Sequence, residues 1–146
     1  MKYLLIITTL LLTACASKNS LNQTSNTSDI MQIIELAEEK APEGVEGPFT
    51  MDILSTGRHG DIFLNSQLDY RDRRNLTVTI NEETAKRLSE VYGSPPEVYF
   101  LNKKVKIDGS AYRAKIWFYV NDKPTEEYSF QTRIYVTSPD QIKVIE

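Results

Sequence analysis

The chain has 146 residues, with 17 Lys and Arg against 20 Asp and Glu, which gives a formal net charge of −3. This balance argues against a nucleic-acid-binding protein held mainly by phosphate contacts, because such domains are usually strongly basic. The single cysteine, Cys15, excludes an internal disulfide, so packing must stabilise the fold.

Residues 1–14 have the features of a signal peptide. Lys2 gives a positive start, and residues 3–12 form an apolar segment that is too short to span a bilayer as a helix. The sequence Leu12-Thr13-Ala14-Cys15 resembles a bacterial lipobox, which implies cleavage before Cys15 and acylation of that residue with chains such as palmitate. The alternative is an ordinary cleaved signal with a chance cysteine. Ala16 is not the Asp that retains similar Gram-negative lipoproteins in the inner membrane, so the resemblance implies the periplasmic face of the outer membrane.

Residues 15–48 are interpreted as a lipidated tether that contains a short helix. Its first part is rich in Ser, Asn, Thr and Gln and cannot bury enough apolar surface to fold. Residues 29–40 then predict a helix with an apolar face, because Ile30, Ile33, Ile34 and Ala37 recur at helical spacing. This helix either binds a partner or a membrane surface, or packs on its own domain. Its glutamates favour packing, since anionic lipid would repel them.

A domain over residues 49–146 follows a boundary rich in Pro and Gly, and its first half predicts three strands, at residues 49–55, 61–66 and 76–80. His59 lies in the turn between the first two strands. Because it has no clustered Cys or His partners, we interpret it as a solvated turn residue and expect no metal site.

The loop before the third strand is densely charged. It carries Arg71, Arg73 and Arg74, which could bind an anion in bidentate fashion. The alternative is that these arginines pair with the aspartates interleaved among them, Asp69 and Asp72.

The second half of the domain predicts one helix and a long hairpin. Asn81 caps the helix, Ala85, Leu88 and Val91 give it an apolar face, and Gly93 ends it. Strands follow at residues 104–107, 112–120 and 128–136, with a short edge strand near the end of the chain. This order predicts a mainly β fold: an OB-fold-like five-stranded Greek-key barrel with one helix between strands 3 and 4.

Alternation along the hairpin predicts which side chains face outward. Tyr112, Ala114 and Ile116 would share the apolar side with Phe130 and Ile134, which requires a bulge at Gly109 to change the phase. The opposite side would then carry aromatic and cationic residues together, as a stacking platform requires: Trp117, Tyr119, Tyr135, Arg113, Lys115 and Arg133. The alternatives are that the helix of residues 29–40 covers this side, or that its aromatic pairs only stabilise the sheet.

Several segments, at residues 60–66, 69–78, 105–109 and 135–142, resemble a group of small bacterial lipoproteins with OB-type domains. Members of that group are described as nucleic-acid-binding on the strength of their fold. The resemblance covers most of residues 49–146 and implies the fold rather than a chemistry. It also implies a ligand on strands two and three, whereas the predicted aromatic side lies on strands four and five.

The sequence contains no catalytic constellation, phosphate-binding loop or metal-ligand spacing, so we expect neither an enzyme nor a cofactor. Two binding functions remain. The first is a lipid-anchored envelope protein that binds a protein or a glycan. The second is a binder of single-stranded nucleic acid or another polyanion, which the neutral charge of residues 49–146 and the periplasmic location disfavour.

Overall fold

The computed structural model describes residues 27–146, so the predicted signal peptide, Cys15 and most of the polar tether lie outside the described residues. The elements in chain order are α1 (Thr27–Glu39), β1 (Val45–Glu46), β2 (Phe49–Asp52), β3 (Ser55–His59), β4 (Asp61–Asn65), β5 (Leu76–Ile80), α2 (Glu82–Tyr92), α3 (Pro96–Tyr99), β6 (Lys104–Ile107), β7 (Ser110–Val120), β8 (Lys123–Val136), the 3-10 helix η1 (Pro139–Gln141) and β9 (Ile142–Val144). The prediction of a mainly β fold is confirmed.

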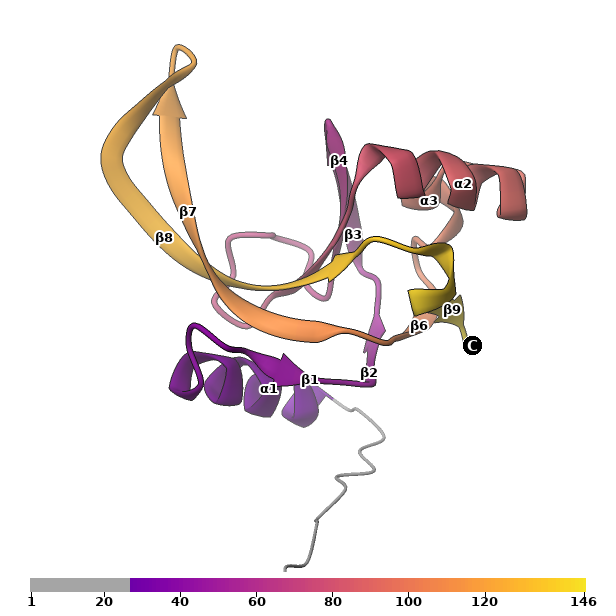
Figure 1. Ribbon diagram of the computed structural model, residues 1–146, viewed down its shortest axis with the longest axis horizontal. Helices are drawn as coiled ribbons and strands as arrows, with labels where there is room; N and C mark the ends of the chain where they lie inside the picture. Colours follow the sequence, from indigo (N-terminus) through magenta and orange to yellow (C-terminus); the bar gives the residue numbers. More distant parts are fainter. Residues whose placement is uncertain (1–26) are drawn as a thin grey trace, which may run out of the picture.

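The strands form two sheets (Figure 1). The six-stranded sheet has the order β1-β7-β8-β5-β4-β3, and the three-stranded sheet has the order β2-β6-β9. All neighbouring pairs are antiparallel except β5 and β8, which are parallel. The predicted short edge strand near the end of the chain is present as β9. The predicted five-strand arrangement differs in detail, because β1 is an additional strand and α3 accompanies α2 between β5 and β6.

Between β2 and β3 the chain passes from the three-stranded sheet to the six-stranded sheet, and the change falls between two adjacent residues. Ile53 N donates to Lys103 O at the end of the three-stranded sheet, whereas Leu54 N donates to Asn65 O in the six-stranded sheet. The chain changes sheets again between β6 and β7, through Asp108 and Gly109. The two sheets are therefore connected by strands that run from one into the other.

The core lies on one side of the six-stranded sheet, against the three-stranded sheet and both long helices. Its fully buried side chains include Leu64, Val78 and Ile134 from the first sheet, Ile107 from the second, and Leu88 from α2. Helix α1 adds Ile30, Ile33 and Ala37, all of them buried. The prediction that this helix packs on its own domain is confirmed.

Helix α2 begins and ends as predicted. Asn81 Oδ1 accepts a hydrogen bond of 2.8 Å from Thr84 N, and Gly93 adopts the left-handed conformation (φ 69°) that ends the helix. The predicted inward position of Val91 is wrong, since its side chain is 66% exposed. The apolar face of α2 instead continues from Leu88 to Tyr92, which is four residues further and so lies on the same side of the helix. The Tyr92 ring stacks on that of Tyr99, with centroids 4.1 Å apart.

The predicted facing of β7 is wrong. Ala111 pairs with Ile134, and both side chains are fully buried. Alternation therefore runs from Ile107 through Gly109 to Ala111 without a change of phase, and the irregularity in the β7–β8 pairing lies between Trp117 and Tyr119 instead. Gly109 is small for a different reason: a Cβ there would lie 3.3 Å from the Ile134 side chain.

Because cross-strand partners point to the same side of a sheet, this register fixes both sides of the hairpin. Lys115 and Trp117 lie on the core side, opposite Phe130 and Tyr128, beyond the point where the core ends. Arg133 lies on the other side, opposite Tyr112. The tip is a two-residue turn in which Asn121 and Asp122 have φ of 51° and 59°, and the hairpin projects away from the rest of the domain (Figure 1).

Candidate ligand-binding hollow

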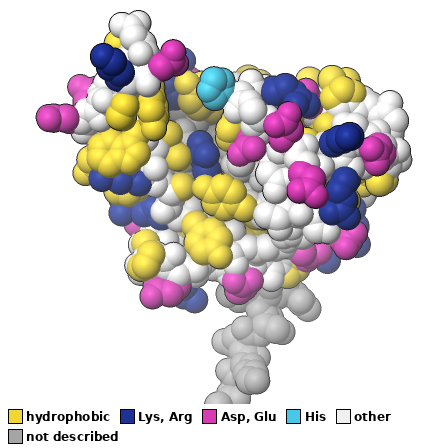
Figure 2. Space-filling model, turned by 45° about the horizontal axis from the view of Figure 1, so that its top comes forward, with side chains coloured by type: hydrophobic (Ala, Val, Ile, Leu, Met, Phe, Trp, Pro, Cys, Tyr) yellow, Lys and Arg dark blue, Asp and Glu magenta, His cyan; other side chains and the backbone are white. Residues whose placement is uncertain are grey.

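A hollow of about 370 Å³ lies on the six-stranded sheet, on the side opposite the core. This volume is within the range usual for ligand pockets. We call it the sheet hollow and define it by its lining residues: Ser55, Thr56, Gly57, Arg58, His59, Phe63, Asn65, Leu68, Tyr70, Thr77, Gln131 and Arg133. Figure 2 shows hydrophobic side chains mixed with Lys and Arg between the hairpin and the single His side chain at the upper edge of the view.

Strand register brings the floor of the sheet hollow together from distant parts of the sequence. Asn65 of β4 pairs with Thr77 of β5, which pairs in turn with Arg133 of β8. Gly57 of β3 pairs with Phe63 on the same side. The residues between them along each strand, such as Leu64 and Val78, point into the core, so the sheet supports the floor rigidly.

Buried polar side chains form a hydrogen-bond network in this floor. Asn75 Oδ1 accepts from Gln67 N (3.2 Å), which fixes the orientation of the Asn75 amide. Its Nδ2 therefore donates to Tyr70 O (3.2 Å) and Asn65 Oδ1 (3.0 Å), and Thr77 Oγ1 donates to the same Asn65 oxygen (3.0 Å). The network fixes the Asn65 side chain, whose Nδ2 group has no hydrogen-bond partner among the described residues.

One wall of the sheet hollow carries Arg133. Its Nε and Nη2 both donate to Gln131 Oε1, at 3.3 and 3.0 Å, and its guanidinium carbon lies 5.3 Å from the centre of the Phe63 ring. Within residues 27–146 no carboxylate forms an ion pair with Arg133. The charge on this side chain is therefore available to a ligand.

The opposite wall carries Arg58, whose charge is already compensated. Its guanidinium makes two hydrogen bonds to the Glu97 carboxylate, at 2.7 and 3.1 Å, and Thr56 Oγ1 donates to Glu97 O (3.0 Å). The hydrogen bond from Arg58 lowers the pKa of Glu97 below its ordinary value. These contacts attach α3 to the edge strand β3.

The loop of residues 66–75, between β4 and β5, forms the rim of the sheet hollow, and we call it the rim loop. It exposes two large apolar side chains, and most of its charged side chains pair with one another. Leu68 is 80% exposed, and Tyr70 is also exposed. Arg74 donates to Asp72 over 2.7 Å and, with the loop backbone, lowers the pKa of Asp72 to about 2. Arg71 lies 3.4 Å from Asp69. Two of the three predicted anion-binding arginines are therefore paired within the loop, as the alternative interpretation has it; Arg73 forms no ion pair among the described residues.

The hairpin carries a ladder of cations and aromatic rings on its core side. Lys115 Nζ lies 4.1 Å from the centre of the Trp117 ring and 3.9 Å from that of Tyr128. Arg113 lies 3.7 Å from the Phe130 ring centre and pairs with Glu38 of α1 at 2.9 Å. The three rings remain 43–46% exposed, but a cation of the same hairpin already lies over each of them. The contacts therefore favour a ladder that stabilises the hairpin over an open stacking platform.

The predicted contact residues consequently lie in three separate places. Arg113, Lys115 and Trp117 belong to the ladder, and Tyr119 is exposed near the hairpin tip. Arg133 and Tyr135 lie on the opposite side of the sheet, where Arg133 lines the sheet hollow. Arg71, Arg73 and Arg74 lie in the rim loop.

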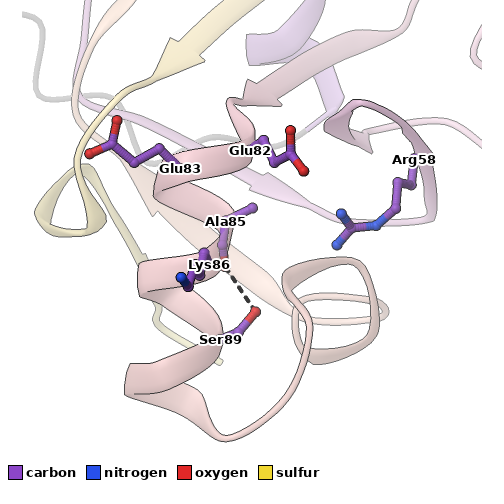
Figure 3. A pocket seen from close by; sticks show the side chains of 6 residues that line it. All are labelled: Arg58, Glu82, Glu83, Ala85, Lys86 and Ser89. Atoms are coloured by element: carbon purple, nitrogen blue, oxygen red, sulfur yellow. Dashed lines mark hydrogen bonds between the residues drawn. The ribbon is translucent and has the colours of Figure 1, made fainter.

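A second depression, of about 700 Å³, lies along α2 and is shown in Figure 3. Glu82, Glu83 and Lys86 line it together with Arg58 and Ser89, and Ser89 Oγ donates to Ala85 O (2.8 Å). It is more open than the sheet hollow and has charges of both signs at its surface. It offers no fixed, unpartnered polar group comparable to Asn65.

Sequence reasoning missed most of the floor, namely Gly57, Phe63, Asn65, Thr77 and Gln131. The sequence signal for this floor was the alternation in Leu76-Thr77-Val78-Thr79-Ile80, which gives the strand one polar side.

The described residues hold no group of three or more His, Cys, Asp or Glu side chains suited to a metal ion. None of the helices within residues 27–146 is long and apolar enough to cross a membrane. Comparison of the chain with protein-family models, curated proteins and solved structures returned no match.

Proposed function

We propose that this protein is a lipid-anchored binding protein of the bacterial cell envelope, which holds a protein or glycan ligand in the sheet hollow without transforming it. The observation that carries the proposal is the Arg133 side chain, which is oriented by Gln131 on a rigid sheet and has no ion-pair partner within residues 27–146. The envelope location rests on the lipobox-like sequence ending at Cys15.

The strand pairing supports the further proposal that the domain is an OB-type barrel. If β2 with β3, and β6 with β7, are each counted as one bent strand, then β2 pairs with β6 and β5 lies parallel to β8, as an OB-type order requires. The second and third strands are then β4 and β5. Ligands of OB domains usually bind on these strands, and Phe63, Asn65 and Thr77 of these strands line the sheet hollow.

The absence of catalysis is also part of the proposal. Ser55 and His59 both line the sheet hollow, and they are the nearest approach to a nucleophile and a base. Ser55 Oγ, however, donates to Gln67 O over 2.7 Å, so its proton is directed to the backbone and not to an imidazole. The lining contains no carboxylate side chain that could act as a general acid or base.

The test is photocrosslinking in intact cells, with a photoreactive amino acid at Leu68 of the full lipidated chain. Val98 is a matched control position, because it is also exposed but lies on α3 outside the sheet hollow. We expect a discrete adduct from Leu68 only, and we expect it to disappear when Gly57→Leu fills the hollow. Mass spectrometry of the digested adduct identifies a protein ligand by a foreign peptide attached at position 68, and a glycan by attached sugar masses. Equal adducts from both positions, or an adduct that persists in Gly57→Leu, would refute the proposal.

The anchor has a separate test. Metabolic labelling with an alkyne analogue of palmitate should label the protein, and Cys15→Ser should abolish the label. An oligonucleotide that binds the protein and dissociates steeply with rising salt would instead favour the polyanion-binding alternative.

A further inference from the structure

The proposed function does not specify the chemical class of the ligand, and the hydrogen-bonding groups of the sheet hollow restrict that class. Resting on that function, we propose that the sheet hollow recognises the carboxylate of an Asp or Glu side chain in an extended peptide segment of a partner protein. Arg133, Asn65 and Gln131 supply the hydrogen-bond donors. The partner is therefore a protein with an exposed acidic residue flanked by apolar ones.

Three side chains of the hollow, Asn65, Gln131 and Arg133, have free hydrogen-bonding groups that are all donors. Asn65 Oδ1 already accepts from Asn75 and Thr77, which leaves the Nδ2 group of Asn65 for a ligand. Gln131 Oε1 already accepts twice from Arg133, which leaves the Gln131 amide nitrogen. A guanidinium has five N–H groups, so Arg133 retains donors beyond the two that Gln131 accepts. These three side chains together present only donors, and a cluster of donors is complementary to an oxyanion, which only accepts.

The occupied acceptors of the floor and its single uncompensated cation disfavour two other ligand classes. Neutral sugar hydroxyls donate as well as accept, and the acceptors of the floor are already occupied. A nucleic acid presents a series of phosphates, whereas the hollow has one uncompensated cation, Arg133, because Glu97 neutralises Arg58. One cation and two amides match a single carboxylate.

The surroundings of these donors suit an extended peptide. Gly57 lies on the floor, and a Cβ built there would meet nothing within 4 Å, so neither packing nor a positive φ requires glycine at this position. Its small size leaves room for a backbone to approach. Leu68, Tyr70 and Phe63 offer apolar contacts to the residues beside the carboxylate.

Strand β8 adds an open edge beside the same hollow. Its pairing with β5 begins at Thr132, so residues 123–131 have a strand partner only in β7 among the described residues. Gln131 belongs to this open edge and also lines the hollow. An extended peptide can therefore add main-chain hydrogen bonds to β8 while its acidic side chain reaches Arg133.

The test uses the full lipidated chain in detergent micelles and two libraries of capped hexapeptides. Both libraries vary Leu, Val and Tyr around a fixed central residue, which is Glu in one and its neutral isostere Gln in the other. Binding is measured by ligand-observed saturation-transfer NMR. We expect the best Glu peptides to bind about tenfold more tightly than their Gln counterparts, since a charge-assisted hydrogen bond is worth more than a neutral one.

Two variants separate recognition from folding. Arg133→Gln should remove the preference for Glu while leaving Gln peptides unaffected, and Arg74→Gln is the matched control because Arg74 pairs with Asp72 outside the hollow. Gly57→Leu should weaken both libraries. Unchanged melting temperatures establish that each variant is folded.

Equal binding of the two libraries, or an unaltered Glu preference in Arg133→Gln, would overturn the inference. Stronger competition by glucuronate or inorganic phosphate than by any Glu peptide would overturn the peptide class. If the Leu68 adduct in cells still depends on Gly57 while the libraries show no preference, the binding function survives and the carboxylate assignment fails.

Discussion

Asn75 donates through Nδ2 to Oδ1 of Asn65 over 3.0 Å, and this bond joins the rim loop of the sheet hollow to its floor. Both side chains are buried, whereas Leu68 in the same loop is almost fully exposed. The loop is therefore held by buried polar contacts more than by apolar packing. Removing one member of such a network leaves other buried polar groups without their partners, so the loop position depends on each of these bonds.

The first prediction follows from this dependence. Asn75→Ala should lower the free energy of unfolding by about 2 to 3 kcal/mol, because it leaves Gln67 N and Tyr70 O, both bonded to Asn75 in the native fold, without that partner. Urea denaturation followed by circular dichroism measures the change. Arg73→Ala in the same loop is the control and should stay within about 0.5 kcal/mol of the native protein. A loss below about 1 kcal/mol for Asn75→Ala would contradict the account of the loop.

The second prediction compares two glycines. Gly44 has φ of +80°, and a Cβ there would lie 2.7 Å from Ala111 O, so Gly44→Ala should cost at least about 2 kcal/mol of stability. Gly57→Ala should be neutral or stabilise by about 0.5 kcal/mol, because alanine has fewer unfolded conformations and meets no neighbour at that position. Thermal unfolding of the two variants checks both values. Comparable destabilisation by both substitutions would mean that Gly57 has a structural role and does not serve to keep the hollow open.

These positions also show what the sequence could and could not predict about the fold. Helix α2 was predictable because its signals are local: Asn81 caps one end and Gly93 ends the other. The facing of β7 was not, because Tyr112 and Ile116 make the wrong side look more apolar than the right one, which carries Arg113 and Lys115. The deciding contact is the pairing of Ala111 with Ile134, which is set by tertiary packing between strands.

The candidate site was hidden for a related reason. Asn65, Thr77 and Arg133 lie on three strands and meet only through the register of the sheet. Alternation within one strand separates its two sides but does not say which side a second layer covers. The aromatic residues of the hairpin were conspicuous in sequence, yet three of them, Trp117, Tyr128 and Phe130, have Lys115 or Arg113 of the same hairpin over their rings.

The third prediction concerns that hairpin ladder. A double-mutant cycle of Lys115→Met and Trp117→Leu should give a coupling energy of about 0.5 to 1 kcal/mol, since the ammonium group lies over the indole ring. Tyr119→Leu combined with Lys115→Met is the control cycle, because Tyr119 makes no cation–π contact among the described residues, and its coupling should be zero within error. Stability in urea gives the energies, and amide exchange at Ile116 and Ser129, which face each other across the hairpin, localises the effect. Equal coupling in both cycles would show that the ladder is not a specific interaction.

The last prediction is a pH dependence that arises from the contact between α3 and the edge strand β3. The hydrogen bond from Arg58 lowers the pKa of Glu97 in the folded protein below its ordinary value of 4.5. A carboxyl whose pKa is lower in the folded than in the unfolded state stabilises the fold above its unfolded pKa, and this contribution is lost as the pH falls through the folded pKa. The native protein should therefore be more stable than Glu97→Gln at pH 7, by up to about 1 kcal/mol for a partly exposed bidentate pair. The difference should shrink steadily below about pH 4.5.

Urea titrations of both proteins between pH 7 and pH 3 measure this difference in stability, with Glu90→Gln as a control on the exposed side of α2. A difference that is constant across this range would mean that the Glu97 charge does not hold α3 against β3.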